Sequence, residues 1–332
     1  MILVAGSANL DFVVRAPHIP APGETVLGSE LRTFPGGKGA NQAIACARAG
    51  GMATTMLLSL GNDDYAKPIE SSLIGAGVQL HVIRDDTHAT GTAFICVSDN
   101  GENAITVASG ANQALRPEHL PPLHGFSHLL LQLETPLASV LAYSQAARAQ
   151  GMSVVLNAAP AQELSADLLS LIDILIVNEG ELAILAGASG TTAQQIERLR
   201  VPGVVVTLGH QGCCACLDGQ WFFEPAHAIR PVDTTAAGDT FCGALVAAMA
   251  QARLADDSTQ PADMMAMALR RASAAAAIAC TRPGAQNSIP TSADVDAFLA
   301  FAPPSTAAAV NELRKLVTTD KGNMTPAGPS NL

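Results

Sequence analysis

The residues with the clearest capacity for chemistry form the stretch 231–241, which reads PVDTTAAGDTF. Apolar residues recur at helical spacing after it, so we expect a helix to begin at or near Asp239. Small residues before a helix let backbone N–H groups approach a ligand closely, and a helix N-terminus attracts anions. We therefore predict that Ala236, Ala237 and Gly238 form an anion hole for a migrating phosphoryl group. Asp239, at its mouth, is placed to accept a proton from an attacking hydroxyl.

A simpler interpretation of this stretch is a turn of small residues in which Asp239 or Thr235 caps the helix. Three observations favour the catalytic interpretation. They are the length of the run, its second acid Asp233, and the patterns found elsewhere in the chain.

A second stretch rich in glycine, residues 35–42, reads PGGKGANQ and precedes a helical run. Its glycines permit close approach of the backbone to a ligand. It is not a P-loop, because the Gly-Lys pair is followed by Gly39 instead of Ser or Thr. The chain also lacks GxGxxG after a strand, which argues against the simplest dinucleotide-binding site. Lys38 and Asn41 are candidates to bond the hydroxyls of a small polar substrate, although a glycine turn before a helix is a common alternative.

Two more polar candidates follow the first apolar segment, residues 2–6, which we expect to be a strand. Ligands of open parallel sheets bind beyond the carboxyl ends of the strands, so Asn9 and Asp11 are candidates to hold a polar ligand. An Asx turn at the strand end fits this fragment equally well.

The hydrophobic pattern predicts the elements that must position these residues. From residue 126 onward, β-branched apolar runs alternate with helical segments, which predicts a parallel sheet covered by helices on both faces. Residues 12–34 alternate loosely, as do residues 91–97 and 103–107, with Asn-Gly between the last two. We expect four short strands in these segments to form a small antiparallel sheet that serves as a lid.

Further expectations follow from local patterns alone. Strands are expected over 127–134, 154–157, 172–178, 204–209 and 213–216, helices over 272–279 and 306–317, and a mobile tail over 318–332. The segment 213–216 contains three cysteines, but no second pair of metal ligands lies at a matching spacing, so a zinc site is disfavoured. Asn178 followed by Glu181 is the pattern of a helix capping box.

Composition limits the function classes. With 332 residues and 48% hydrophobic content, the chain can bury a large α/β core. A net charge of -11 argues against a nucleic-acid or anionic-membrane surface. Seven cysteines, mostly in apolar runs, fit reduced core residues. No signal peptide and no membrane-spanning segment are recognised, so we expect a soluble cytoplasmic protein.

Residues 36–42 and 233–241 together resemble the two signatures of the PfkB, or ribokinase-like, carbohydrate kinases. The resemblance runs from residue 1 to about 302 and includes residues 101–103, 110–112, 132–134 and 281–286. It implies a three-layer α/β/α fold with a mostly parallel central sheet and a β lid. The implied main domain comprises residues 1–9, 36–88 and 111–302, the lid 10–35 and 89–110, and a C-terminal helix and tail 303–332. In this family the lid also forms a homodimer contact.

The resemblance implies transfer of the γ-phosphate of ATP to a primary hydroxyl of a furanose sugar, here the 5-hydroxyl of D-ribose. It makes Asp239 the catalytic base, with the anion hole named above. The positions that match the family's sites are, for the sugar, Asn9, Asp11, Gly37, Lys38, Gly39, Asn41, Glu134 and Asp239; for the nucleotide, Asn178, Thr207, Leu208, Gly209, Gly212, Gly238 and Ser273; for an activating potassium ion, Asp233, Thr235, Ala279, Arg282, Gly284 and Ser288; and for an acid associated with magnesium, Glu181. At Ser273 the family often carries a larger polar residue near the adenine.

Three alternatives stay open at this point. The chain could be another kinase of this fold, acting on deoxyribose, a nucleoside or a keto-sugar. It could be a catalytically silent sugar-binding or regulatory protein, although the intact Asp239 disfavours this. A nicotinamide-dependent dehydrogenase is the most distant alternative, because its glycine fingerprint is missing.

Overall fold

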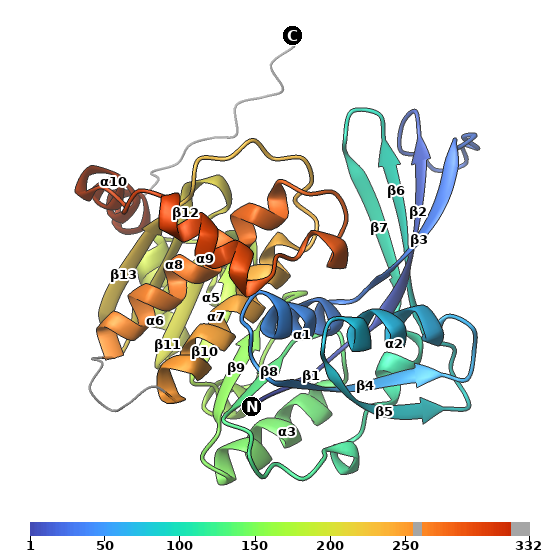
Figure 1. The fold of residues 1–332 in the computed structure, drawn as a ribbon, viewed down its shortest axis with the longest axis horizontal. Coiled ribbons are helices and arrows are strands. Elements are labelled where there is room, and N and C mark those ends of the chain that lie inside the picture. The colour runs from blue at the N-terminus through green and yellow to red at the C-terminus, as the bar shows by residue number, and fades with distance from the viewer. Residues whose placement is uncertain (255–260, 320–332) are drawn as a thin grey trace.

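Nine strands form the central sheet, in the order β13-β12-β11-β10-β9-β8-β1-β4-β5 (Figure 1). The structure is a computed structural model that describes residues 1–254 and 261–319. The strands are β1 Ile2–Ala5, β4 Thr54–Gly61, β5 Gln79–Asp85, β8 His128–Leu131, β9 Ser153–Asn157, β10 Ile174–Asn178, β11 Gly203–Thr207, β12 Gly212–Leu217 and β13 Gln220–Pro225. Neighbouring strands from β5 to β11 are parallel, and β12 and β13 continue the sheet antiparallel. The predicted, mostly parallel sheet is confirmed.

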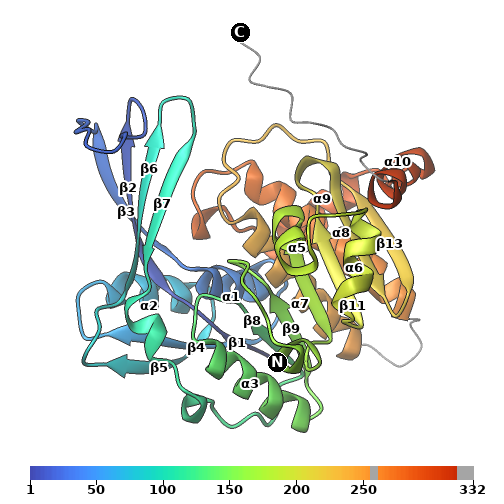
Figure 2. The same ribbon diagram turned by 180° about the vertical axis from the view of Figure 1, so that it is seen from behind.

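Helices cover both faces of this sheet, as Figures 1 and 2 show. In β1, Ile2 and Val4 enter one hydrophobic core, whereas Leu3 and Ala5 enter the other. The first core contains residues of α1 Lys38–Arg48, α2 Ala66–Gly75, α7 Ala237–Leu254, α8 Pro261–Cys280 and α9 Ser292–Phe301. The second contains residues of α3 Leu137–Ala149, α4 Ala166–Leu169, α5 Glu179–Ala186, α6 Thr192–Leu199 and α10 Ala307–Thr318. Short 3₁₀ helices span Gly110–Ala114, Pro117–His119, Gly209–Gln211 and Gln286–Ser288. The layers are therefore α/β/α, as predicted.

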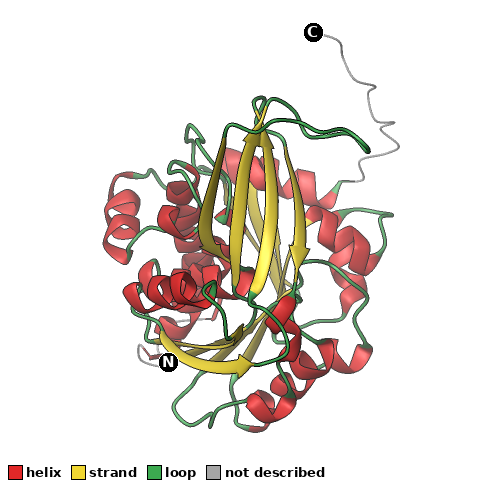
Figure 3. Cartoon of the chain, turned by 90° about the vertical axis from the view of Figure 1, so that its right-hand side faces the viewer, coloured by secondary structure: helices red, strands yellow, loops and turns green. Residues whose placement is uncertain are grey.

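A second sheet of four strands projects from one end of this body (Figure 3). Its strands are β2 Asn9–Ala16, β3 Glu30–Gly36, β6 Gly91–Ser98 and β7 Asn103–Ala108, in the order β3-β2-β6-β7. The two outer pairs are antiparallel, but the central pair β2–β6 is parallel, so the prediction of an antiparallel sheet was wrong at this pair. The reason is that β2 follows β1 and β6 follows β5, and both segments leave the main sheet in the same direction. The domain boundaries given above stay a prediction.

The strand predicted over 213–216 and the helices predicted over 272–279 and 306–317 are confirmed. The strand predicted over 127–134 is shorter and spans His128–Leu131. The three clustered cysteines lie in β12, and all seven cysteines are free. Residues 272–279 lie in α8, and residues 307–317 lie in α10 with Thr306 as its N-cap. The tail predicted over 318–332 falls, from residue 320 onward, outside the described residues. Among the helices described here, none is long and apolar enough to cross a membrane.

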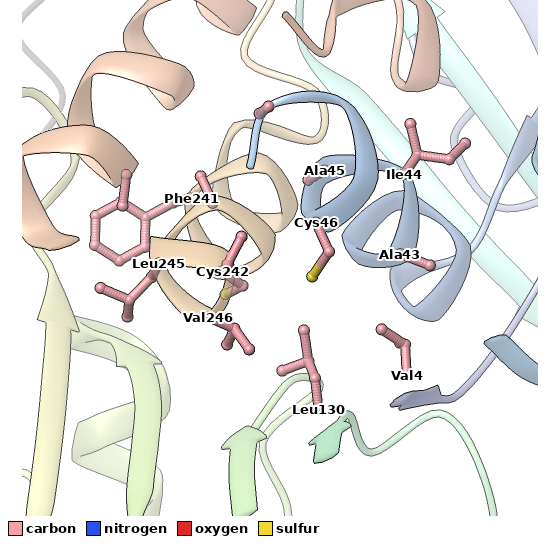
Figure 4. Packing of buried hydrophobic residues seen from close by; sticks show 14 of the residues in the cluster. Val4, Ala43, Ile44, Ala45, Cys46, Leu130, Phe241, Cys242, Leu245 and Val246 are labelled. Atoms are coloured by element: carbon pink, nitrogen blue, oxygen red, sulfur yellow. The ribbon is translucent and has the colours of Figure 1, made fainter. Parts of the chain in front are cut away.

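Helices α1 and α7, which begin within the stretches 35–42 and 231–241, pack side by side over β1 and β8 (Figure 4). Cys46 from α1 and Cys242 from α7 lie in this interface, above Val4 and Leu130 of the sheet. The close packing requires a glycine, because a Cβ at Gly243 would lie 2.5 Å from the carbonyl oxygen of Gln42 and 2.5 Å from Cβ of Ala45. The core thereby brings the beginnings of these two helices together.

Candidate active site

The predicted anion hole lies at the start of α7. The helix begins at Ala237, two residues before the predicted start at Asp239, because the N–H of Thr240 already donates to the carbonyl of Ala236 at 2.8 Å. Ala236 has a φ of 58°, in the left-handed region that residues other than glycine rarely adopt. Such strain is often found at functional sites. The amide of Ala237 donates to the carbonyl of Thr234 at 3.2 Å, while Gly238 is exposed at the surface.

The carboxylate of Asp239 does not cap its own helix but is held by two side chains of α1. Nδ2 of Asn41 donates to its Oδ2 at 2.9 Å, and Nε2 of Gln42 donates to its Oδ1 at 2.9 Å. Asp239 remains partly exposed. A fixed and accessible carboxylate of this kind can orient a hydroxyl and accept its proton.

Two predicted sugar-contact residues, Asp11 and Lys38, interact electrostatically with this carboxylate. Burial, followed by the negative charges of Glu134 and Asp239, raises the pKa of Asp11 to about 7. Burial lowers the pKa of Lys38, but the negative charges of Asp239, Glu134 and Glu181 outweigh it, so the pKa of Lys38 is raised. The charged groups that interact here come from β2, α1, α5, α7 and the segment after β8.

Backbone geometry explains the glycines of this site. Gly37 has a φ of 90°, and a Cβ there would lie 2.8 Å from Cα of Ala8. A Cβ at Gly39 would lie 2.6 Å from the backbone nitrogen of Ser7. The side chain of Glu134 accepts from Oγ of Ser7 at 2.5 Å and from the backbone N–H of Lys38 at 3.2 Å. The turn before α1 is thereby tied to the ends of β1 and β8.

Asn9 is buried, and its Oδ1 accepts from Nδ2 of Asn112 at 2.7 Å. Oδ1 of Asn112 in turn accepts from the N–H of Ala8 at 2.9 Å, which fixes the amide of Asn112. Sequence reasoning did not single out Asn112 for this role. The amide of Asn9 is thereby held in one orientation at the point where β1 gives way to the lid strand β2.

The predicted nucleotide contacts lie at the carboxyl ends of two neighbouring strands. Asn178 of β10 and Thr207 of β11 are register partners. The capping box is confirmed, because Asn178 accepts from the N–H of Glu181 at 2.8 Å and Glu181 accepts from the N–H of Asn178 at 2.8 Å. Gly209 and Gly212 both have positive φ, and the side chain of Leu208 is buried in the core. Leu208 can therefore contact a nucleotide only through its backbone.

Ser273 is buried in α8, and Glu181 keeps a partly exposed carboxylate. Burial raises the pKa of Glu181, whereas the hydrogen bond from the Asn178 backbone lowers it, and the net shift is upward. One oxygen of this carboxylate is thus committed to the capping box, and the other is available to a cation.

The residues predicted to hold potassium join two loops. Asp233 accepts from the N–H and the hydroxyl of Thr235, at 2.9 and 2.6 Å, and from the N–H of Gly284 at 2.8 Å. Burial raises the pKa of Asp233, but these hydrogen bonds more than offset the burial and lower it. The guanidinium of Arg282 contacts Asp294 at 3.3 Å, so at this site Arg282 can offer only its carbonyl. Ala279 and Ser288, the other two residues predicted for this site, are buried.

A cleft of about 820 Å³ lies between the lid and these loops. Asp11 and Arg15 of β2 line one side, and Asp233, Thr235 and Gly284 line the other. Asp11 is the predicted sugar-contact residue that lines this cleft, and Asp239 is not among its lining residues. Within the described residues, no group of three or more His, Cys, Asp or Glu side chains is arranged to hold a metal ion.

Comparison with known proteins identifies the class of protein that this fold and site define. A model of the pfkB family of carbohydrate kinases matches residues 1–292, and the chain belongs to this family. A ribokinase of Haemophilus influenzae is 37% identical over 313 residues, which cover 91% of this chain and 99% of that protein.

Solved structures agree with this family assignment. A ribokinase of Thermotoga maritima has a TM-score of 0.78 and 35% identity, covering 90% of this chain and 99% of its own. A ribokinase of Arabidopsis thaliana, described as complexed with ribose and ATP, has a TM-score of 0.80 and 32% identity over 91% of this chain and 99% of its own. The chain is thus a carbohydrate kinase, similar over most of its length to ribokinases.

Several buried residues that lie behind the site were not recognised from the sequence. Gln42 lies in the glycine-rich stretch 35–42, but no role was predicted for it from the sequence. None was predicted for Gln132, Asn157 or Gln286 either. Nε2 of Gln286 donates to Oδ1 of Asn41 at 3.1 Å. Asn157 accepts a hydrogen bond from Gln42, and Gln132 donates one to Gln42. The only sequence signal was a set of amide side chains in otherwise apolar segments, such as Gln132 after the buried strand β8.

Proposed function

We propose that this chain phosphorylates D-ribose at its 5-hydroxyl with ATP, giving D-ribose 5-phosphate. The observation that carries the proposal is the carboxylate of Asp239, fixed by two amide donors at the start of α7 and sharing a site with Lys38, Asp11 and Glu134. The family relationship supports a sugar as acceptor, and the relatives named above support ribose and ATP.

The chemistry assigned to Asp239 follows from the acidities involved. The pKa of an alcohol lies far above that of any carboxylic acid, so Asp239 does not form an alkoxide before reaction. In a loose phosphoryl-transfer transition state the proton leaves late, and the carboxylate first orients the hydroxyl and then takes the proton. Positioning, and charge stabilisation by the amides of Ala236–Gly238, would supply most of the rate enhancement. The amide of Ala237 would take part by exchanging the carbonyl of Thr234 for the phosphoryl group.

Two cations belong to this proposal. Mg²⁺ bound with ATP would neutralise phosphate charge, and the free oxygen of Glu181 is available to it, directly or through water. K⁺ would be held by Asp233 and by carbonyl groups of the 279–288 segment, which suits a hard cation with oxygen ligands. Because Asp233 already joins the loop of Thr235 to Gly284, an ion here would stiffen the loop that leads into the anion hole. Replacing K⁺ by Na⁺ in the assay is expected to lower kcat, and equal rates in both salts would remove this role.

We also propose that the chain forms a homodimer through the lid and acts in the cytoplasm. The lid exposes large apolar side chains, among them Leu31, Phe94 and Ile105, with 64%, 55% and 56% of their surface accessible. Sedimentation velocity would detect the dimer, and Ile105→Asp is expected to dissociate it. A cytoplasmic location is supported by the seven free cysteines.

A panel of acceptors tests the proposed reaction most directly. ADP release would be measured with ATP and D-ribose, deoxyribose, a keto-sugar such as fructose, and adenosine, with the product from ribose identified by mass and by its phosphorylated position. The proposal expects the highest kcat/KM for D-ribose and phosphorylation at the 5-hydroxyl. A higher kcat/KM for another acceptor would reassign the substrate, and no ADP release with any acceptor would favour a silent binding protein.

A further inference from the structure

Gln42 lies next to Asn41 in α1, and its side chain is completely buried. Its Nε2 donates to Oδ1 of Asp239 at 2.9 Å and to Oδ1 of Asn157 at 2.9 Å. Its Oε1 accepts from Nε2 of Gln132 at 2.7 Å. Both amide hydrogens and the carbonyl oxygen of Gln42 are therefore used, and one of these bonds reaches the proposed base.

The chemistry of its partners fixes the orientation of this amide. The backbone carbonyl of Ile176 can only accept, and it accepts from Nδ2 of Asn157 at 3.1 Å. The oxygen of Asn157 must therefore face Gln42, as does an oxygen of Asp239. A flipped Gln42 would direct its own oxygen at these two oxygens and would lose both bonds. Only one orientation satisfies the group, and in it Nε2 points at Asp239.

The partners of Gln42 belong to the rigid part of the fold. Gln132 directly follows β8, Asn157 ends β9, and Ile176 lies in β10, so three neighbouring parallel strands determine the position of this amide. Gly243 of α7 contributes as well, because only a residue without a side chain lets α7 approach the backbone of Gln42 so closely. Asp239 lies on α7, and Gln42 connects its carboxylate to the central sheet.

Asn41 and Gln42 hold the two oxygens of Asp239 but differ in what else they can do. Asn41 is one of the predicted sugar contacts and can exchange partners when a sugar binds. Gln42 has no exposed surface and reaches no ligand. We propose that Gln42 is a positioning residue, which holds the Asp239 carboxylate at the angle needed to take the sugar's proton before substrate arrives. This proposal rests on the proposed role of Asp239 as the base.

The deciding variant is Gln42→Glu, which keeps the size of the side chain and still accepts from Gln132. In either protonation state Asp239 loses the neutral N–H donor of the amide. An ionised side chain at this position repels Asp239, and a protonated one shares its proton with the carboxylate that must take the proton of the sugar. With D-ribose and Mg-ATP, we expect kcat to fall by between about tenfold and a hundredfold, the range that misplacement of a reacting group produces. The KM for ribose should stay within about threefold, because Gln42 does not contact the sugar. Gln42→Met, which removes all three bonds, should show the same split between kcat and KM.

Gln132→Met is the matched control. It removes the bond from Gln132 to Gln42, which belongs to the same buried network but does not involve Asp239. It leaves the bond from Gln42 to Asp239 in place. We expect Gln132→Met to lower the melting temperature less than Gln42→Met, because it removes one bond of the network instead of three, while kcat stays within about threefold of wild type. If Gln42→Met fails to fold, the comparison of Gln42→Glu with Gln132→Met decides the matter.

Two results would overturn the inference. One is a folded Gln42→Glu with kcat within about threefold of wild type. The other is an equal loss of kcat in Gln132→Met, which would show a general structural role for the network. Failure of the proposed function looks different, because the wild type would then release no ADP with D-ribose. Failure of the role of Asp239 also looks different, because Asp239→Asn would then retain its turnover. An inactive Asp239→Asn beside an active Gln42→Glu refutes only the role of Gln42.

Discussion

Replacing Asp239 by asparagine changes one oxygen of the proposed base into an NH₂ group and keeps the shape of the side chain. In the wild type, Asn41 and Gln42 each donate an N–H to a different oxygen of Asp239, both at 2.9 Å. In Asp239→Asn, the new NH₂ group must face the N–H donor of either Asn41 or Gln42, and two donors cannot form a hydrogen bond with each other. The variant therefore loses the proton acceptor and also one of the bonds that orient the side chain.

The size of the effect follows from these two losses. General base catalysis contributes roughly 10²- to 10⁴-fold to a rate, and each factor of ten corresponds to about 1.4 kcal/mol in the barrier. A misplaced side chain adds to this loss, so we expect kcat to fall by about 10³-fold or more, or at least ~4 kcal/mol. The KM for ribose should change little, because Asn9, Asp11 and Lys38 remain in place.

The assay is ADP release at saturating ribose and Mg-ATP, with ribose affinity measured separately by calorimetry. Asp167→Asn is a suitable control, because Asp167 is an exposed acid in the first turn of α4, on the opposite face of the sheet. It makes the same chemical change at a helix start without touching the site. A folded Asp239→Asn that retains turnover within about tenfold of wild type would refute the role of Asp239 as base.

Two other predictions concern stability. Burial and the charges of Glu134 and Asp239 raise the pKa of Asp11 from 3.8 to about 7, so the unfolded chain releases this proton at lower pH than the folded one. The stability contributed by protonated Asp11 is complete below pH 3.8 and is lost as the pH rises to about 7. In the ligand-free protein, Asp11→Asn should thus raise the melting temperature, relative to wild type, more at pH 8 than at pH 5; an equal difference at both pH values would contradict the raised pKa. Gly243→Ala should lower the free energy of unfolding by about 1–3 kcal/mol in chemical denaturation, because its Cβ would lie 2.5 Å from α1 atoms. Gly75→Ala in α2, where a Cβ meets nothing within 4 Å, should leave stability unchanged or raise it by up to about 1 kcal/mol, and an equal loss in both variants would argue against the packing explanation.

The sequence alone determined the features that depend on residues a few positions apart. The alternation of apolar strands and helices after residue 126 predicted the parallel sheet, and Asn-Gly at residues 100–101 predicted the β6–β7 hairpin. The Asn178–Glu181 capping box was recognisable for the same reason, since both partners lie within one helical turn. These patterns act through the local backbone, so they can be read without knowing the fold.

Only the tertiary structure decided how the site is completed. The parallel pairing of β2 with β6, the raised pKa of Asp11 and the left-handed Ala236 each depend on groups that chain order does not place together. Asn41 and Asp239 are 198 positions apart, yet their side chains are hydrogen-bonded. The physical reason is that burial, charge and hydrogen bonding act over a few ångströms in space, whatever the distance along the chain. The stretches 35–42 and 231–241 thus predicted which helices begin at the site, and the packing of α1 against α7 decided which amides hold its carboxylate.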